Sequence, residues 1–286
     1  MKKRLISSII GLTVLLFSIW KIDTFIFVAA ISILCFYTSF EILDAAKNTN
    51  KSLFVSSMIF ATSVPYLFAL EAIAKYHLLF IAGLIYLLVI SLIMLKNHKN
   101  VKFKTFLSSV FGSFVLPLCF STICRIGNAG FFFNEKYTYG IGIYLTVFAF
   151  CCAWLTDTFA YIVGSKLGKH KLCPEISPKK SVEGAVGGFV LSIIFNFIIY
   201  IITDRFIVSL SIIPIWIIIA LSGILSILSM IGDLTASIIK RDCGIKDFGN
   251  IMPGHGGMMD RFDSCIFVFP TLYFVLYILN NFECLV

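Results

Sequence analysis

Three of the five aspartates in a polar stretch near the C-terminal end of the chain, residues 231–264, lie close to its two ends. Asp233 ends one apolar run, and Asp260 and Asp263 begin the next. Side chains three residues apart share a helix face, so we expect the carboxylates of Asp260 and Asp263 to point into one site. Carboxylate oxygens suit a hard cation such as Mg²⁺, which proteins bind through a few carboxylates together with substrate phosphates. The stretch therefore predicts a magnesium site.

Basic side chains are interleaved with these aspartates: Lys240, Arg241, Lys246 and Arg261. A metal ion and nearby basic groups stabilise the charge that develops during phosphoryl-type transfer. The glycines Gly254, Gly256 and Gly257 let the backbone approach a ligand closely. The pattern favours a phosphate-transfer site, and the alternative is an ion-paired loop without chemistry.

A second polar stretch, residues 154–184, contains Asp157 within an apolar run. An ionisable side chain inside a membrane span is costly unless it faces protein, water or a partner, so Asp157 is a candidate functional residue. The alternative is an interfacial position near the helix end. Five lysines of this stretch are interleaved with Gly, Ser and Pro: Lys166, Lys169, Lys171, Lys179 and Lys180. Such a segment suits an anionic polyphosphate, although lysines beside a membrane commonly serve topology.

The elements that position these residues are expected to be membrane-spanning helices. Apolar residues make up 59% of the chain and charged residues only 13%, where soluble domains carry about 25% charged residues. The apolar runs approach the roughly 20 residues of a spanning helix, and they lack the short alternating segments of a membrane barrel. We predict an all-α polytopic integral membrane protein with about nine transmembrane helices. The expected spans lie near residues 5–20, 24–43, 53–74, 77–95, 105–124, 139–163, 184–202, 206–231 and 264–282.

The distribution of basic residues predicts a cytoplasmic N-terminus. With nine spans in this orientation, all of the 23 basic residues lie inside except Lys21, Lys75, Arg125, Lys136 and Arg205. This asymmetry follows the positive-inside rule and places both polar stretches on the cytoplasmic side. The net charge of +8 therefore reflects topology, and no nucleic-acid partner is expected. We expect residues 1–138 to form N-terminal membrane helices and residues 139–286 a catalytic membrane region, in a bacterial plasma membrane.

The segment from Ser237 to Asp263 resembles the signature of the phosphatidate cytidylyltransferase (CDP-diacylglycerol synthase) family. The matching positions keep the family's spacing: Ser237, Lys240, Arg241, Lys246, Asp247, Gly249, Pro253, His255, Gly256, Gly257, Asp260, Arg261 and Asp263. Met252 stands where the family has another apolar residue. So many polar positions over one short segment make the match specific.

The upstream stretch is similar to a second conserved region of that family. Its matching positions are Asp157, Thr158, Ala160, Tyr161, Gly164, Gly168, Lys169, Ser177, Pro178, Lys180, Glu183, Gly184, Gly187 and Gly188. Ser165, Ser181 and Val182 stand where the family commonly has a basic residue, Thr and Trp, respectively. The first 130 or so residues match only as a series of spans.

The resemblance implies a Mg²⁺-dependent homodimeric membrane enzyme that transfers the cytidylyl group of CTP to phosphatidic acid and releases pyrophosphate. By motif position, Asp233 and Asp260 are the metal carboxylates, and a second cation is left open. The implied catalytic residues are Asp233, Asp260, Lys240, Arg241, Lys246 and Asp263. The implied substrate-binding residues are Asp157, Lys169, Ser177, Lys180, Glu183, Ser237, Asp247, His255 and Arg261.

Two other classes of function remain open at this point. A membrane transporter or channel is compatible with many spans and an intramembrane aspartate, although no inverted repeat is apparent. A related CTP-dependent lipid enzyme, such as a polyprenol kinase or a cytidylyltransferase for another lipid phosphate, is the second. Labelled CTP offered with a panel of lipid phosphates separates the enzymes, and solute flux without chemical turnover indicates the transporter.

Overall fold

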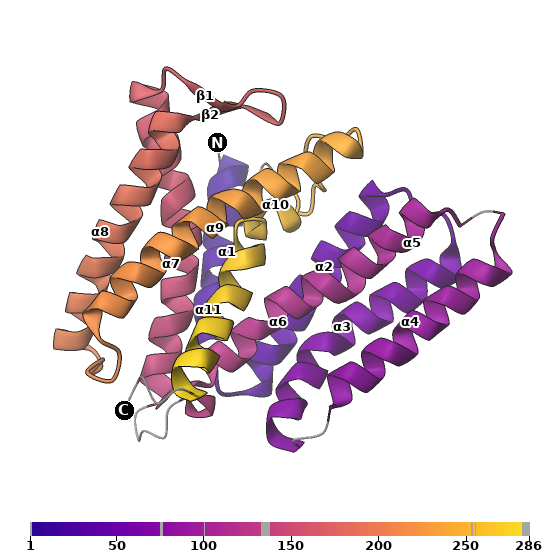
Figure 1. Ribbon diagram of the computed structural model, residues 1–286, viewed down its shortest axis with the longest axis horizontal. Coiled ribbons are helices and arrows are strands. Elements are labelled where there is room, and N and C mark those ends of the chain that lie inside the picture. The colour runs from indigo at the N-terminus through magenta and orange to yellow at the C-terminus, as the bar shows by residue number, and fades with distance from the viewer. Residues whose placement is uncertain are drawn as a thin grey trace. The chain divides into compact units, whose positions relative to one another are not determined.

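The structure, a computed structural model, describes residues 2–74, 77–99, 101–132, 138–252, 254 and 256–281. Most of this part is helical (Figure 1). The α-helices are α1 (Lys2–Trp20), α2 (Phe25–Ala45), α3 (Lys51–Ala74), α4 (Leu78–Lys96), α5 (Phe103–Val110), α6 (Leu116–Gly127), α7 (Thr138–Leu167), α8 (Val182–Phe206), α9 (Ile215–Asp242), α10 (Met259–Phe262) and α11 (Cys265–Asn281). A π-helix, η1 (Phe111–Val115), a short 3-10 helix, η2 (Ala129–Phe131), and two strands, β1 (Lys171–Cys173) and β2 (Ser177–Ser181), complete the set.

The helices confirm the expected fold class, an all-α polytopic membrane protein. Seven described helical segments are long and apolar enough to cross a membrane: Phe25–Ala45, Lys51–Leu70, Leu78–Lys96, Phe103–Gly127, Tyr139–Leu167, Val182–Phe206 and Ile215–Asp242. Two shorter apolar helices, Ile9–Trp20 and Cys265–Asn280, coincide with the first and last expected spans. Apolar helices form here because a bilayer leaves backbone groups no partner except within the chain. The number of spans and the orientation of the N-terminus stay predictions.

The chain forms two compact units. Unit 1 contains Met1–Arg125 and Asp242–Phe262, and unit 2 contains Ile126–Arg241 and Asp263–Val286. The expected functional division at residue 138 is not tested by this packing and stays a prediction.

Unit 1 is built around α2, α3 and α4, which lie side by side in Figure 1. Phe60 on α3 stacks on Tyr86 on α4 with ring centroids 4.1 Å apart, in a core cluster of buried apolar side chains. The expected span 105–124 is not a regular helix, because η1 interrupts it between α5 and α6. The hydroxyl of Ser113 in η1 donates to the carbonyl of Ser109 at 2.5 Å. Hydroxyl groups of this kind supply hydrogen bonds where a membrane helix departs from regular geometry.

Unit 2 depends on close packing of α7 against α8. A Cβ added at Gly188 would lie 2.6 Å from the carbonyl oxygen of Thr156, and one at Gly184 would lie 2.6 Å from that of Ala160. Gly184 and Gly188 are four residues apart, and such a pair lets two membrane helices approach through their backbones. The carbonyl groups of Thr156 and Ala160 on α7 thus lie against α8.

A chain of buried polar side chains ties α9 to the same pair of helices. The Thr156 hydroxyl on α7 donates to Ser226 on α9 at 3.0 Å, and Ser226 donates to Ser192 on α8 at 3.0 Å. Ser229, one turn further along α9, donates to the carbonyl of Ala153 at 3.2 Å. Inter-helix hydrogen bonds of this kind hold membrane helices together where apolar contacts with lipid offer no preference.

A β-hairpin, which the sequence reasoning did not predict, follows α7. Its strands β1 and β2 are antiparallel, with Lys171 opposite Ser181 and Cys173 opposite Ser177. Figure 1 shows the hairpin at one end of α7 and α8. The Ser181 hydroxyl accepts the N–H of Gly184 at 3.1 Å and thereby caps α8. The cap fixes the point at which the hairpin joins the helix.

The expected common helix face for Asp260 and Asp263 is wrong. Helix α10 ends at Phe262, and Asp263 lies in the turn that separates α10 from α11. A helical spacing rule applies only within one uninterrupted helix. The two carboxylates consequently have different surroundings, each within its own unit.

Candidate active site

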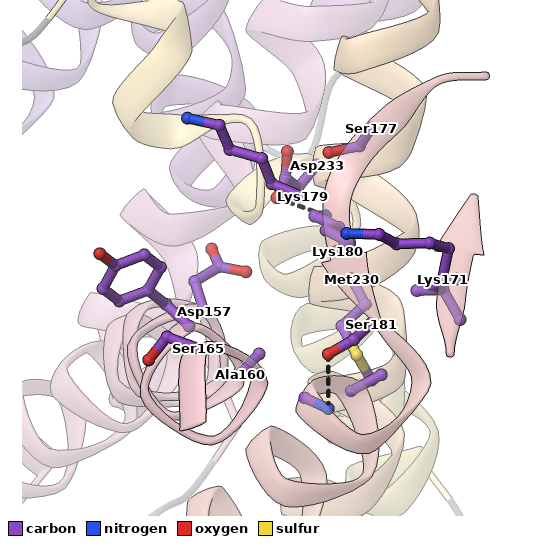
Figure 2. Close-up of a pocket in the computed structure, with 15 residues that line it drawn as sticks. Asp157, Ala160, Ser165, Lys171, Ser177, Lys179, Lys180, Ser181, Met230 and Asp233 are labelled. Atoms are coloured by element: carbon purple, nitrogen blue, oxygen red, sulfur yellow. Dashed lines mark hydrogen bonds and ion pairs between the residues drawn. The ribbon is translucent and has the colours of Figure 1, made fainter. Parts of the chain in front are cut away.

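A pocket of about 490 Å³ opens in unit 2 between α7, the hairpin, α8 and α9. Its volume lies in the range of small-molecule sites. The lining residues are Asp157, Ala160, Tyr161, Gly164, Ser165, Lys171, Leu172, Ser177, Lys179, Lys180, Ser181, Gly184, Ala185, Met230 and Asp233. Both stretches singled out in the sequence contribute to it. Figure 2 shows lysines from the hairpin on one side and Asp157 from α7 on the other.

Asp233 reaches the pocket from α9 and is paired there. Oδ2 of Asp233 lies 2.5 Å from Nζ of Lys180 on β2, and both side chains are about three-quarters buried. The Ser237 hydroxyl, one turn along α9, donates to Oδ1 of Asp233 at 3.5 Å. Figure 2 shows the lysine extended from the hairpin toward the carboxylate. The ion pair therefore joins two elements that border the pocket.

Asp157 is held from the turn before α11. The hydroxyl of Ser264 donates to Oδ2 of Asp157, and the N–H of Ser264 donates to Oδ1 of Asp263 at 2.9 Å. Ser264 is buried, and it links the carboxylate of α7 to that of the turn. Sequence reasoning did not select Ser264, which lies directly after the family signature.

Asp263 is a buried carboxylate beside Lys240 on α9, with Oδ2 3.9 Å from the lysine Nζ. Helix α9 approaches this turn closely, because a Cβ at Gly232 would lie 2.7 Å from the carbonyl oxygen of Asp263. Burial and then the charge of Asp233 raise the pKa of the Asp263 carboxyl above its ordinary value, against the opposing effect of Lys240. The Asp263 carboxylate thus interacts electrostatically with both Asp233 and Asp157.

This cluster brings together three carboxylates and two ammonium groups. A Mg²⁺ ion fits its donor set in kind, because carboxylate oxygens are its usual protein ligands and one or two suffice when a substrate supplies phosphate oxygens. In the part of the chain that the structure describes, no three His, Cys, Asp or Glu side chains are arranged as ligands of one ion. A metal site here would therefore take the form that depends on substrate oxygens, not a closed protein cage.

The rest of the signature lies in unit 1, in the segment 243–258 between α9 and α10, here called the signature loop. Asp260, just beyond the loop, accepts the N–H of Phe248 at 2.8 Å and that of Gly257 at 3.0 Å through Oδ2. Met252 N–H donates to the carbonyl of Gly256 at 3.0 Å, which closes a turn. Gly256 has φ +90°, a conformation that favours glycine. Asp260 therefore organises the loop around its carboxylate.

Other predicted residues occupy the hairpin and its surroundings. Glu183 on α8 accepts the N–H of Lys169 at 3.1 Å, and its Oε1 lies 2.6 Å from Nδ1 of His170. Nε of Arg241 donates to the carbonyl of Ile176 at 3.4 Å and ties the end of α9 to the hairpin. Glu183 and Arg241 thus hold the backbone that borders the pocket.

Three predicted residues of unit 1 have exposed side chains: Lys246, Asp247 and Arg261. Lys169 in unit 2 is exposed as well. His255 lies outside the described residues. Asp233 lies in unit 2 and Asp260 lies in unit 1. Their binding to one metal ion therefore stays a prediction.

Sequence reasoning also missed Glu41, a buried carboxylate on α2. Its two oxygens accept the N–H groups of Met258 and Met259 at 2.8 and 2.7 Å. The signal used for Asp157 could have identified Glu41 as well, because Glu41 is an ionisable residue within the expected span 24–43.

Comparison with known proteins gives concordant results. A model of the cytidylyltransferase family matches residues 2–279. A phosphatidate cytidylyltransferase of Staphylococcus saprophyticus subsp. saprophyticus is 44% identical over 158 residues, 55% of this chain and 58% of the relative. The proteins of the same name from Staphylococcus haemolyticus and Staphylococcus aureus are each 41% identical over 158 residues. The aligned region spans 58% of the length of each of these relatives.

Proposed function

Since the chain belongs to the cytidylyltransferase family, we propose that it transfers the cytidylyl group of CTP to phosphatidic acid, giving CDP-diacylglycerol and pyrophosphate. The observation that carries the proposal is the pocket of unit 2, where lysines from the hairpin face carboxylates from α7 and α9 within a membrane protein. The names of the relatives, phosphatidate cytidylyltransferase, support CTP and phosphatidate as the substrates.

Lysines of the hairpin are suited to the triphosphate. Lys171, Lys179 and Lys180 all line the pocket, and ammonium groups bind phosphate oxygens through charge-assisted hydrogen bonds. Ser177 and Ser181 add hydroxyl groups to the same wall. We assign this wall to the nucleotide, which enters from water, and leave the apolar surfaces of the helices to the acyl chains of phosphatidic acid.

The reaction needs little covalent help from the protein. A phosphate monoester has a second pKa of about 6, so phosphatidic acid is largely a dianion at neutral pH and attacks without a general base. Its oxygen forms a bond to the α-phosphorus of CTP, and the bond from that phosphorus to the pyrophosphate oxygen breaks. Basic residues near the site, Lys180 and Lys240 among them, offset the negative charge of the departing pyrophosphate.

Mg²⁺ is part of the proposal, with Asp233 and Asp260 as its carboxylate ligands. When bound, a divalent cation supplies positive charge to phosphate oxygens and orients the leaving group. A second cation near Asp157 and Asp263 is compatible with the cluster of carboxylates that these residues form with Asp233. A further part of the proposal is a site that faces the cytoplasm from the plasma membrane, which the excess of basic residues in the expected inner loops supports. The last part is a homodimer, which rests on the family resemblance alone.

The direct test uses purified protein in lipid nanodiscs with CTP labelled at the α-phosphate. We expect label to enter lipid only with phosphatidic acid and a divalent cation, with equal amounts of pyrophosphate released. A panel with polyprenyl phosphate and other lipid phosphates identifies the acceptor. Labelling of another lipid phosphate in preference to phosphatidic acid, or no labelling at all, would contradict the proposal.

A further inference from the structure

Glu41 is a carboxylate buried within a membrane-spanning helix of unit 1. It lies on α2, and only 1% of the residue is exposed. An ionisable group in this position costs several kcal/mol unless hydrogen-bond donors compensate it. Neither of the two stretches that carry the family resemblance contains this residue. Burial of this carboxylate therefore requires hydrogen-bond donors from elsewhere in unit 1.

The partners are backbone N–H groups at the start of α10. Met258 donates to Oε1 at 2.8 Å and Met259 donates to Oε2 at 2.7 Å. The first N–H groups of a helix have no acceptor inside that helix, so an external acceptor satisfies them. Since these residues follow Glu41 by 217 and 218 positions, the carboxylate fastens the end of the signature loop to α2.

Two glycines of the loop are shaped around the same carboxylate. A Cβ added at Gly249 would lie 2.6 Å from Oε1 of Glu41, and one at Gly257 would lie 2.5 Å from it. Both distances are well below van der Waals contact, so any side chain there would displace Glu41 or the loop. The need for glycine at these two signature positions therefore follows from Glu41.

Gly257 also connects Glu41 to Asp260. A Cβ added at Gly257 would meet the Glu41 carboxylate, and the N–H of Gly257 donates to Oδ2 of Asp260 at 3.0 Å. A shift of Gly257 therefore moves a donor that orients the Asp260 carboxylate. The N–H of Phe248, from the other arm of the loop, orients the same oxygen at 2.8 Å. Glu41 and Asp260 thus each accept backbone N–H groups of the signature loop.

We propose that Glu41 is a positioning residue: by fastening Met258, Met259 and Gly257 to α2, it sets the orientation of the Asp260 carboxylate. Its effect on turnover rests on the proposed cytidylyl transfer, whereas its effect on the loop does not. Residues that orient a metal-binding carboxylate without touching the metal commonly change metal affinity by about 10- to 100-fold when they are replaced.

The experiment compares Glu41→Gln with Asp44→Asn, an exposed carboxylate on the same helix. Amide hydrogen exchange at Met258 and Met259 is measured without divalent cation, and initial rates are measured over a range of Mg²⁺ concentrations. For Glu41→Gln we expect faster exchange at both amides and a Mg²⁺ concentration for half-maximal rate about tenfold higher. Asp44→Asn should match the wild type in both measurements.

A double variant adds a test that is independent of general destabilisation. Gly257→Ala alone should lower the initial rate, because the added Cβ would meet the Glu41 carboxylate. In the Glu41→Ala background the carboxylate is absent, so the initial rate of the double variant should be no lower than that of Glu41→Ala alone. Strictly additive losses would mean that the two residues act separately and would overturn the proposal.

Unchanged exchange and unchanged Mg²⁺ dependence in Glu41→Gln would also overturn it. A wild-type protein without CTP turnover would refute the proposed function instead. The exchange rates of Met258 and Met259 would then still decide whether Glu41 holds the loop.

Discussion

Lys180 and Asp233 form an ion pair across the pocket of unit 2, with Nζ and Oδ2 2.5 Å apart. Lys180 comes from the hairpin and Asp233 from α9, so the pair connects the two polar stretches of the sequence. Each side chain is about a quarter exposed, and Nζ of Lys180 is itself buried in the ion pair. The pair therefore holds Lys180 at the place where we propose that the triphosphate binds.

Replacement of Lys180 by Gln should weaken nucleotide binding. We expect KM for CTP to rise about tenfold, since a charge-assisted contact to phosphate contributes about 1.5–3 kcal/mol. Steady-state kinetics with Lys166→Gln as the control checks this, because Lys166 is an exposed lysine at the end of α7 that does not line the pocket. Equal KM values in the two variants would remove Lys180 from the binding site.

Asp233→Asn and Asp260→Asn should each lower pyrophosphate release by about 100-fold or more, because each removes a charge that we assign to the metal site. Asn keeps the size of the side chain and one acceptor oxygen, so both variants should remain folded. Circular dichroism checks the helices, and Asp242→Asn, an exposed carboxylate at the end of α9, serves as control. Near-normal turnover in either variant would exclude that residue as a metal ligand.

Gly188→Ala should destabilise unit 2, since the added methyl group would meet the carbonyl oxygen of Thr156 at 2.6 Å. Overpacking of this kind costs about 1–3 kcal/mol. Gly223→Ala on α9 is the matched control, because its Cβ would meet only ordinary contacts at 3.5 Å and beyond. Thermal unfolding in detergent should give a lower Tm for Gly188→Ala alone. The same Tm in both variants would contradict the close approach of α7 and α8.

Asp263 predicts a pH dependence of stability. Its pKa is raised in the folded protein, chiefly by burial, so the folded state binds this proton more tightly than the unfolded state does. The free energy of unfolding should therefore fall as pH rises from the unfolded pKa, about 4, up to the folded value. Thermal unfolding of the wild type and Asp263→Asn, both without divalent cations, measures the difference. We expect a shallower decline in the variant, and parallel curves would refute the assignment.

Hydropathy alone determined the membrane fold, because a bilayer forces every apolar run of sufficient length into a helix. The spacing of polar residues from Ser237 to Asp263 was likewise sufficient to indicate the family, because a match at so many positions of one short segment can be recognised without the tertiary structure. Asp157 was found by the same reasoning, as a charge that an apolar run does not otherwise tolerate.

Other features depended on contacts between distant segments. The hydrogen bond from Ser264 to Asp157, the pairing of Lys180 with Asp233 and the hold of Glu41 on the signature loop each join residues far apart in the chain. The break after α10 likewise separated two aspartates whose spacing suggested a common face. Hydropathy and local spacing describe each segment alone, whereas the partner of a buried charge is selected by packing. For this reason the tertiary structure decided which carboxylates and lysines meet.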